Sequence, residues 1–306
     1  MLSRGSVEGG YSKMIPGNIE ENLYYIELFT KKKIRNPLVG NHISLLKGHG
    51  YDFWDHKKYE FGDDTRKIDW NATARMGYTL IKNTHEEKDI DIFVAADLSN
   101  SMNFVTGAHS KKELLLYITA MLAYSALSDQ MRIGFLGFTD KVEMEIEPKK
   151  GRAHLWTLMN QLWDFKPAKH TTTRIMPALE RLRQRLSRMS IVFLISDFFF
   201  QENMFEEVVF KQLVSKNDLV PIILNDPLET DLPEGQGYLR FRDLETGQQQ
   251  CVRLSRKNRM IYSEHLRQQR RALIEQFYQY GLDFQEIKTH EPFYELLYSL
   301  FLMRKR

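Results

Sequence analysis

From residue 89 onward, short apolar runs alternate with amphipathic segments, and this alternation limits the folds that the chain can adopt. The apolar runs predict strands at 90–96, 132–138, 190–196, 219–224 and 283–287, and a further strand at 142–146 that pairs with its predecessor through a short turn. Strands separated by helices are typical of a doubly wound, mostly parallel sheet. We therefore predict a Rossmann-like α/β fold with six strands in the order 3-2-1-4-5-6.

The remaining segments define the predicted domain organisation. Helical spacing occurs at 111–128, 153–163, 175–189, 203–215, 256–280 and 291–303. Proline and glycine interrupt the alternation at about 227–254, where two short β-like runs predict a hairpin insertion. We expect a loose N-terminal end at 1–17, an N-terminal α+β extension at 18–88 that begins with a helix at 19–33, and the α/β domain at 89–306.

Composition excludes several classes of protein. The formal net charge is only +3, from 43 basic and 40 acidic residues, which is too balanced to indicate nucleic-acid binding by itself. The single cysteine, Cys251, excludes an internal disulfide and a cysteine-rich zinc site. The N-terminal residues lack the apolar core of a signal peptide, and no apolar run approaches the ~18 residues of a membrane span. We expect a cytoplasmic protein.

The strongest candidate site follows the first predicted strand of the α/β domain. Asp97, Ser99 and Ser101 place one carboxylate and two hydroxyls on a tight loop at the carboxyl end of that strand. In open α/β sheets, ligands bind just outside these ends. Carboxylate and hydroxyl oxygens are hard ligands that suit Mg²⁺. Aspartate and serine are also common in turns and helix caps, so a purely structural loop is the alternative.

The pattern Asp97-x-Ser99-x-Ser101 resembles the metal-ion-dependent adhesion site of von Willebrand factor A (vWA) domains. In that family, a threonine from a second loop joins the site. The loop 169–179 is similar to the family's threonine loop, although its glycines are missing. The resemblance implies that Thr173 is the ligand, and Thr171 and Thr172 are alternatives.

An aspartate from a third loop completes the vWA site, and Asp197 is the residue that the resemblance assigns to this position. Asp197 directly follows a predicted strand, as Asp97 does, and the predicted strand order makes these two strands neighbours. Two facing carboxylates repel each other unless a cation lies between them. The expected cofactor is Mg²⁺, with Mn²⁺ as the alternative.

A second resemblance is more specific and covers the chain from about Gly48 to its C-terminus. The string G-D-D-x-R-x-I-D-W-x-x-x-A-R begins at Gly62 and is followed by a short strand and the D-x-S-x-S-M pattern. This arrangement is similar to the bacterial family named domain of unknown function fifty-eight. Members of that family carry a vWA domain and are typically encoded beside MoxR-type AAA+ ATPases. The resemblance implies a chaperone-like protein-binding module that acts with such an ATPase in the assembly or maturation of a client protein.

The charged stretch at the start of that string carries a structural prediction. Asp63, Asp64, Arg66 and Asp69 surround Trp70 in the sequence, a mixture that is typical of an ion-pair cluster packed around an aromatic anchor. We expect this stretch to stabilise the fold, with a partner-contact surface as the alternative. If Trp70 is buried, its replacement by alanine costs about 3–5 kcal/mol.

Three phenylalanines follow Asp197, where the vWA family often has glycine, and they predict an apolar rim around the site. We expect at least one of them to be exposed, because an exposed aromatic beside a desolvated charge is typical of an interface hot spot. The predicted partner-binding rim consists of Asn100, Met102, His170, Phe198 and Phe199. The partner is expected to supply an Asp or Glu that completes the metal shell.

Two other functions remain as alternatives. A metal-dependent hydrolase or phosphoryl-transfer enzyme is possible in principle, but the three loops hold no histidine or glutamate except His170, and the chain has no P-loop string. We therefore expect no catalytic residues. Nucleic-acid binding by the basic segment 253–271 is the second alternative, although a charged helical face is usually only solvated.

Overall fold

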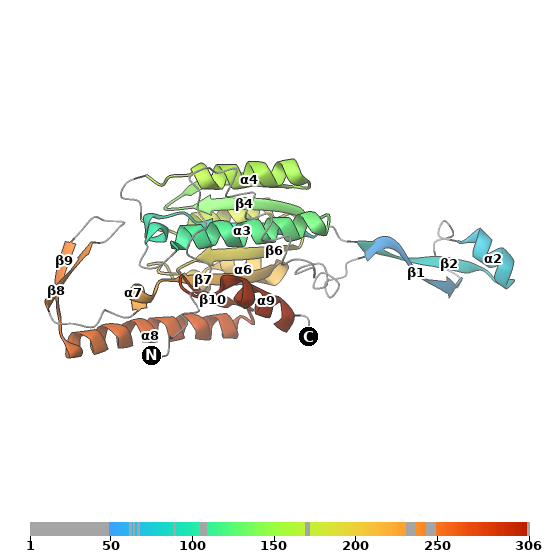
Figure 1. Cartoon of the computed structure of the whole chain (residues 1–306). Helices are drawn as coiled ribbons and strands as arrows, with labels where there is room; N and C mark the ends of the chain where they lie inside the picture. Colours follow the sequence, from blue (N-terminus) through green and yellow to red (C-terminus); the bar gives the residue numbers. More distant parts are fainter. Residues whose placement is uncertain are drawn as a thin grey trace, which may run out of the picture.

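The computed structural model describes residues 49–60, 63, 65, 68–87, 90–104, 109–168, 172–230, 237–242 and 249–304. The predicted loose end at 1–17 and the predicted helix at 19–33 lie outside the described residues. Figure 1 shows a central sheet with helices on both faces, and a separate ribbon of two strands that carries a short helix at its far end.

The described strands belong to one large sheet and two small ones. The two-stranded sheets pair β1 (His49–Lys58) with β2 (Leu80–Glu87), and β8 (Gly237–Arg242) with β9 (Gln249–Leu254). The large sheet contains β3 (Asp91–Asp97), β4 (Arg132–Phe138), β5 (Val142–Lys149), β6 (Ser190–Ser196), β7 (Asp218–Asn225) and β10 (Gln285–Lys288).

In the α/β domain, four helices lie close to their predicted positions: α3 (Lys111–Ser128), α4 (Arg152–Asp164), α8 (Arg256–Gln279) and α9 (Phe293–Met303). The helix predicted at 175–189 is shorter, as α5 (Met176–Arg185), and α6 spans Val208–Lys216. Two short helices were not predicted: α7 (Pro227–Thr230) and, in the N-terminal extension, α2 (Trp70–Met76). Short 3₁₀ turns lie at Asn100–Asn103 and Met204–Glu206. The helix predicted at 203–215 is therefore divided into a 3₁₀ turn and α6.

The order of strands in the large sheet is β10-β7-β6-β3-β4-β5. When the six strands are numbered 1 to 6 along the chain and the sheet is read from β5 to β10, this is the predicted order 3-2-1-4-5-6. The pairs that join β3, β4, β6, β7 and β10 are parallel, whereas β5 runs antiparallel to β4, as the short turn between them requires. The predicted α/β class, its mostly parallel six-stranded sheet and its strand order are confirmed.

The sheet is buried on both faces, which explains why its strands are continuous apolar runs. On β3, Ile92 and Val94 contact the core beneath α3, α4 and α9, whereas Phe93 and Ala95 contact the core on the other face. That second core contains side chains of α5 and α6 and, from α8, the fully buried Phe277. The carboxyl ends of β3 and β6 therefore lie between two packed layers, one on each face of the sheet.

The N-terminal ribbon differs from the prediction at its aromatic anchor. Trp70 is the first residue of α2, its side chain is 70% exposed, and α2 buries none of its residues. The prediction of a buried Trp70 is wrong because α2 sits at the end of a two-stranded ribbon, where no second layer of the described structure covers it (Figure 1). Asp69 does have a structural role, because its Oδ1 accepts hydrogen bonds from the N–H groups of Asn71 and Ala72 and caps α2.

The predicted hairpin insertion is present as β8 and β9, which pair in antiparallel register from Gly237–Leu254 to Arg242–Gln249.

Asp63, in the N-terminal ribbon, also has a local role, because its Oδ2 accepts a hydrogen bond from the Glu60 N–H at 2.9 Å. Asp64 and Arg66 lie outside the described residues. Among the described helices, none combines the length and the apolar character that crossing a membrane requires.

Candidate functional site

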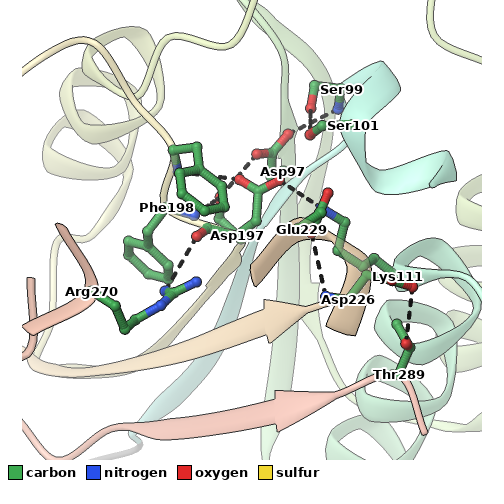
Figure 2. Close-up of polar contacts among 12 residues, drawn as sticks. Asp97, Ser99, Ser101, Lys111, Asp197, Phe198, Asp226, Glu229, Arg270 and Thr289 are labelled. Atoms are coloured by element: carbon green, nitrogen blue, oxygen red, sulfur yellow. Dashed lines mark hydrogen bonds and ion pairs between the residues drawn. The ribbon is translucent and has the colours of Figure 1, made fainter. Parts of the chain in front are cut away.

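Asp97 ends β3 in the middle of the sheet and is completely buried. Its Oδ1 accepts a hydrogen bond from the Ser99 N–H at 2.9 Å, and its Oδ2 accepts one from Ser196 Oγ on β6, also at 2.9 Å. Both bonds fix the plane of the carboxylate, so Asp97 is held in one orientation at the carboxyl edge of the sheet (Figure 2).

The predicted hydroxyl donors lie beside this carboxylate. Ser99 Oγ and Ser101 Oγ are 2.9 Å apart, and the Ser101 hydroxyl lies close enough to Asp197 to help lower its pKa. Asp197 Oδ1 accepts a hydrogen bond from the Phe199 N–H at 3.2 Å. Figure 2 shows Asp97, Ser99, Ser101 and Asp197 gathered in one cluster, so four of the five predicted metal ligands are brought together.

Thr173, the fifth predicted ligand, is buried, and its loop is held at the same edge of the sheet. The next residue, Arg174, donates its N–H to the carbonyl of Thr139, directly after β4, and β4 is the neighbour of β3. Of the alternative threonines, Thr172 is exposed, whereas Thr171 lies outside the described residues. Burial at the sheet edge favours Thr173 over Thr172 as the hydroxyl donor.

The sequence analysis missed one positively charged side chain of the site, the ammonium group of Lys111. Lys111, the first residue of α3, is fully buried and places its Nζ 2.8 Å from Asp197 Oδ2. The same Nζ lies 2.6 Å from Glu229 Oε1 and 2.8 Å from Glu229 Oε2 on α7. Lys111 and Glu229 therefore extend the site beyond the predicted set (Figure 2).

The electrostatics of the two aspartates differ because only one of them contacts Lys111. Burial and the nearby charge of Asp197 raise the pKa of Asp97 to about 7. Burial also acts to raise the pKa of Asp197, but the Lys111 ammonium and the hydrogen bonds from Phe199 and Ser101 outweigh it and bring this pKa below its ordinary value. Asp197 is therefore a stable anion, and Asp97 is the group whose charge needs compensation.

The predicted rim is only partly accessible. Phe199 is 44% exposed, and its ring faces the guanidinium of Arg270 at 5.5 Å, which confirms that at least one of the three phenylalanines is exposed. Asn100 is partly exposed and donates from its Nδ2 to the Ala168 carbonyl at 3.0 Å. His170 lies outside the described residues.

Two of the predicted rim residues, Met102 and Phe198, are buried, so their prediction as part of an accessible rim is wrong. Met102 is 1% exposed because the 3₁₀ turn at Asn100–Asn103 directs its side chain into the core beneath α3. Phe198 is 8% exposed and packs against Phe200 and Phe277 at ring-centroid distances of 5.7 and 5.4 Å.

Phe198 also has an unusual backbone conformation, with φ at +61°. Positive φ is strained for a bulky residue and favours glycine. In this conformation the Phe198 N–H reaches back to Ser196 Oγ at 3.0 Å, while the following Phe199 N–H reaches Asp197 Oδ1. The sharp turn therefore supports both the carboxylate and the serine that orients Asp97.

The basic helix α8 contributes directly to the site. Arg270 Nη1 donates to the Asp197 carbonyl at 3.4 Å, and the hydroxyl of Tyr262 donates to the Glu229 carbonyl at 3.4 Å. At least one arginine of the segment predicted as a nucleic-acid-binding alternative thus faces the protein interior and not solvent.

The donor chemistry of the cluster fits a hard divalent cation. The described residues contain no group of three or more His, Cys, Asp or Glu side chains arranged to hold a metal ion. A cation between Asp97 and Asp197 would therefore depend on the serine and threonine hydroxyls and on water, as Mg²⁺ does when few carboxylates are available. It would also compensate the charge of Asp97, which burial makes costly.

The sheet order and the position of the site at the carboxyl ends of β3 and β6 define a vWA-like α/β domain. The chain belongs to the family described as "Protein of unknown function DUF58", whose sequence profile matches residues 55–272. An uncharacterized protein of Mycobacterium tuberculosis, Rv1480, is 24% identical over 240 residues, which cover 76% of this chain and 75% of the relative. An uncharacterized protein of Mycobacterium bovis, Mb1516, matches to the same extent.

Several solved structures are similar to this chain at low sequence identity. BatB from Bacteroides thetaiotaomicron is 13% identical, with a TM-score of 0.47 over 70% of this chain and 98% of that one. An aerotolerance-related membrane protein from Bacteroides fragilis is 14% identical, with a TM-score of 0.49 over the same shares of the two chains. A von Willebrand factor type A protein from Catenulispora acidiphila is 8% identical, with a TM-score of 0.39 over 72% of this chain and 43% of that one.

Proposed function

We propose that this protein is a metal-dependent protein-binding module. In this proposal, Asp97, Ser99, Ser101, Thr173 and Asp197 hold Mg²⁺ or Mn²⁺, some of them through water. The observation that carries the proposal is the pairing of two buried carboxylates from adjacent strand ends with the hydroxyls of Ser99 and Ser101. Such an oxygen-only set leaves coordination positions open for water or for a ligand from outside.

The partner in this proposal supplies an Asp or Glu side chain that completes the metal shell. Phe199 supports this because its exposed ring lies next to Asp197, where it adds apolar contact area beside the charged one. The family resemblance points to a MoxR-type AAA+ ATPase, or the client on which the two proteins act together, as that partner. Assembly or maturation of the client is the proposed outcome.

Cation binding is tested by titration calorimetry of the full chain with Mg²⁺ and Mn²⁺. Wild-type protein is expected to bind one of these ions, and Asp97→Ala is expected to abolish binding. Asp91→Asn is the matched control, because Asp91 lies at the other end of the same strand as Asp97. Its Oδ1 pairs with Arg132 Nε at 2.7 Å, away from the site. Equal binding by wild type and Asp97→Ala would contradict the proposal.

Partner binding is tested by co-purification with the MoxR-type ATPase of the same organism, with and without EDTA. The complex is expected to form with Mg²⁺ and to be lost with EDTA or with Asp97→Ala. Co-purification that is equal under all conditions would show that docking does not use this site. Magnesium-dependent turnover of a phosphate ester by the purified chain would instead favour the alternative of hydrolytic chemistry.

A further inference from the structure

Lys111 is buried inside the acidic centre that we propose as a cation site. Its side chain has no exposed surface, and its three short contacts reach one oxygen of Asp197 and both oxygens of Glu229. An ammonium group has three N–H donors, so this geometry can use its entire hydrogen-bonding capacity. Lys111 is therefore held in place by its partners and is not a solvated surface lysine.

The charge of Lys111 is maintained by these partners. Burial alone lowers the pKa of a lysine, but the carboxylates of Asp197 and Glu229 outweigh burial and hold the pKa of Lys111 above its ordinary value. The ammonium lies within hydrogen-bonding distance of a proposed metal ligand, because Lys111 Nζ is 2.8 Å from Asp197 Oδ2.

The charges in the centre do not cancel. Asp97, Asp197 and Glu229 contribute three carboxylates, whereas Lys111 contributes one ammonium and Arg270 one guanidinium, which donates to the Asp197 carbonyl. The ammonium of Lys111 compensates the negative charges of Asp197 and Glu229. The hydrogen-bond donors to Asp97 are neutral, namely the Ser99 N–H and Ser196 Oγ. The uncompensated charge therefore lies on the side of Asp97, Ser99 and Ser101.

We propose that Lys111 is an internal counter-ion that keeps the acidic centre folded without a divalent cation and weakens the binding of one, and that Glu229 opposes this effect by sharing the ammonium. This inference rests on the proposed cation site. Lys111 and Glu229 act as affinity-determining residues with opposite signs, because one places a positive charge beside the cation and the other reduces that charge. The centre is thus built to gain and lose its cation reversibly.

The first test replaces Lys111 by methionine, which keeps the length of the side chain and removes its charge. In titration calorimetry of the full chain, Lys111→Met is expected to bind Mg²⁺ about tenfold or more tightly than wild type. Its melting temperature is expected to fall in EDTA and to recover with Mg²⁺ by a larger increment than in wild type. A merely structural lysine would lower the melting temperature equally in both conditions.

The matched control is Lys112→Met, since Lys112 is the next residue of α3 and donates its Nζ to the Phe165 carbonyl at 2.5 Å, not to a carboxylate of the site. This variant is expected to bind Mg²⁺ as wild type does. A gain in affinity equal to that of Lys111→Met would overturn the proposal, because it would indicate an effect of net charge alone.

The second test, Glu229→Gln, gives an answer even if Lys111→Met does not fold. Glutamine has nearly the same shape but leaves Lys111 with one carboxylate, so Mg²⁺ binding is expected to weaken several-fold. Unchanged affinity in Glu229→Gln, or in a folded Lys111→Met, would overturn the inference while the proposed cation site stands. Absence of binding by wild type and by both variants would overturn the cation site as well.

Discussion

Ser196 on β6 donates a 2.9 Å hydrogen bond to Oδ2 of Asp97 on β3, although 99 positions separate the two residues in the sequence. The bond joins the ends of two neighbouring parallel strands at the point where the strand order reverses. Ser196 also accepts the Phe198 N–H, so one hydroxyl orients the carboxylate and stabilises the turn after β6. The proposed cation site and the sheet that supports it therefore share the same hydrogen bonds.

The raised pKa of Asp97 predicts how stability depends on pH in the absence of a divalent cation. The pKa is about 7 in the folded protein and near 3.8 in an ordinary aspartate, so the folded state binds the proton more tightly than the unfolded state does. Stability contributed by protonated Asp97 is therefore present at pH 4 and is lost as the pH rises to about 7, with a total on the order of a few kcal/mol.

Asp97→Asn isolates this effect, because asparagine stays neutral at every pH. In EDTA, the melting temperature of Asp97→Asn relative to wild type is expected to rise between pH 4 and pH 8. Mg²⁺ is expected to reduce this difference at pH 8 by stabilising the wild-type carboxylate. A difference that is independent of pH would contradict the raised pKa.

Because Phe198 has a positive φ, we expect its replacement by glycine to destabilise the protein less than its replacement by alanine. Removing the ring is expected to destabilise the protein, because it packs against Phe200 and Phe277. Phe198→Ala keeps a Cβ at positive φ, whereas Phe198→Gly releases that strain. Chemical denaturation is expected to show the glycine variant about 1 kcal/mol more stable than the alanine variant, with both below wild type. An alanine variant as stable as the glycine variant would show that no strain is relieved.

Gly137 on β4 predicts a coupling between packing and cation binding. A Cβ added at this position would lie 2.2 Å from Cδ1 of Leu98, which is the residue between Asp97 and Ser99. Gly137→Ala is therefore expected to displace Leu98, to destabilise the protein by about 1–3 kcal/mol and to weaken Mg²⁺ binding.

Gly134 provides the control for this prediction. Gly134 precedes Gly137 by three residues on β4 and so lies farther from the loop that contains Ser99. A Cβ at Gly134 would lie 2.6 Å from the ring of Phe93 on β3. Gly134→Ala is expected to destabilise the protein to a similar extent without a change in Mg²⁺ affinity. Equal loss of affinity in both variants would mean that the effect comes from general destabilisation.

The sheet and the position of its polar edge could be predicted from the sequence, because buried parallel strands are apolar throughout and Asp97 and Asp197 each follow such a run. Lys111 and Glu229 could not be predicted in this way. Their role depends on how the side chains of α3 and α7 pack against the carboxyl ends of the strands, which the sequence alone does not specify. One signal was present: a lysine in the first turn of a helix opposes the helix dipole, which indicates a nearby anion.

Trp70 shows why the prediction for the N-terminal ribbon was wrong. Large aromatic residues are often buried, but burial requires a second layer that the local sequence does not specify. Because Trp70 is 70% exposed, Trp70→Ala is expected to change the free energy of unfolding by less than about 0.5 kcal/mol. Asp69→Ala, which removes the cap of α2, is expected to cost about 1 kcal/mol of stability in the ribbon. Hydrogen exchange of the α2 amides would measure both effects; faster exchange in Trp70→Ala than in Asp69→Ala would contradict them.

The exposed ring of Phe199 separates partner binding from cation binding. Phe199 contributes its backbone N–H to Asp197, and this donor remains when the side chain is shortened to alanine. Phe199→Ala is therefore expected to bind Mg²⁺ with wild-type affinity and to bind the partner at least tenfold more weakly, as loss of a hot-spot aromatic does.

Tyr278→Ala is the control for this prediction. Tyr278 is a second exposed aromatic, on α8, that packs against Phe284 and has no described contact with Asp197 or Lys111. Calorimetry for the cation and co-purification for the ATPase would measure the two effects. Equal partner binding by Phe199→Ala and Tyr278→Ala would show that the partner does not dock beside Asp197.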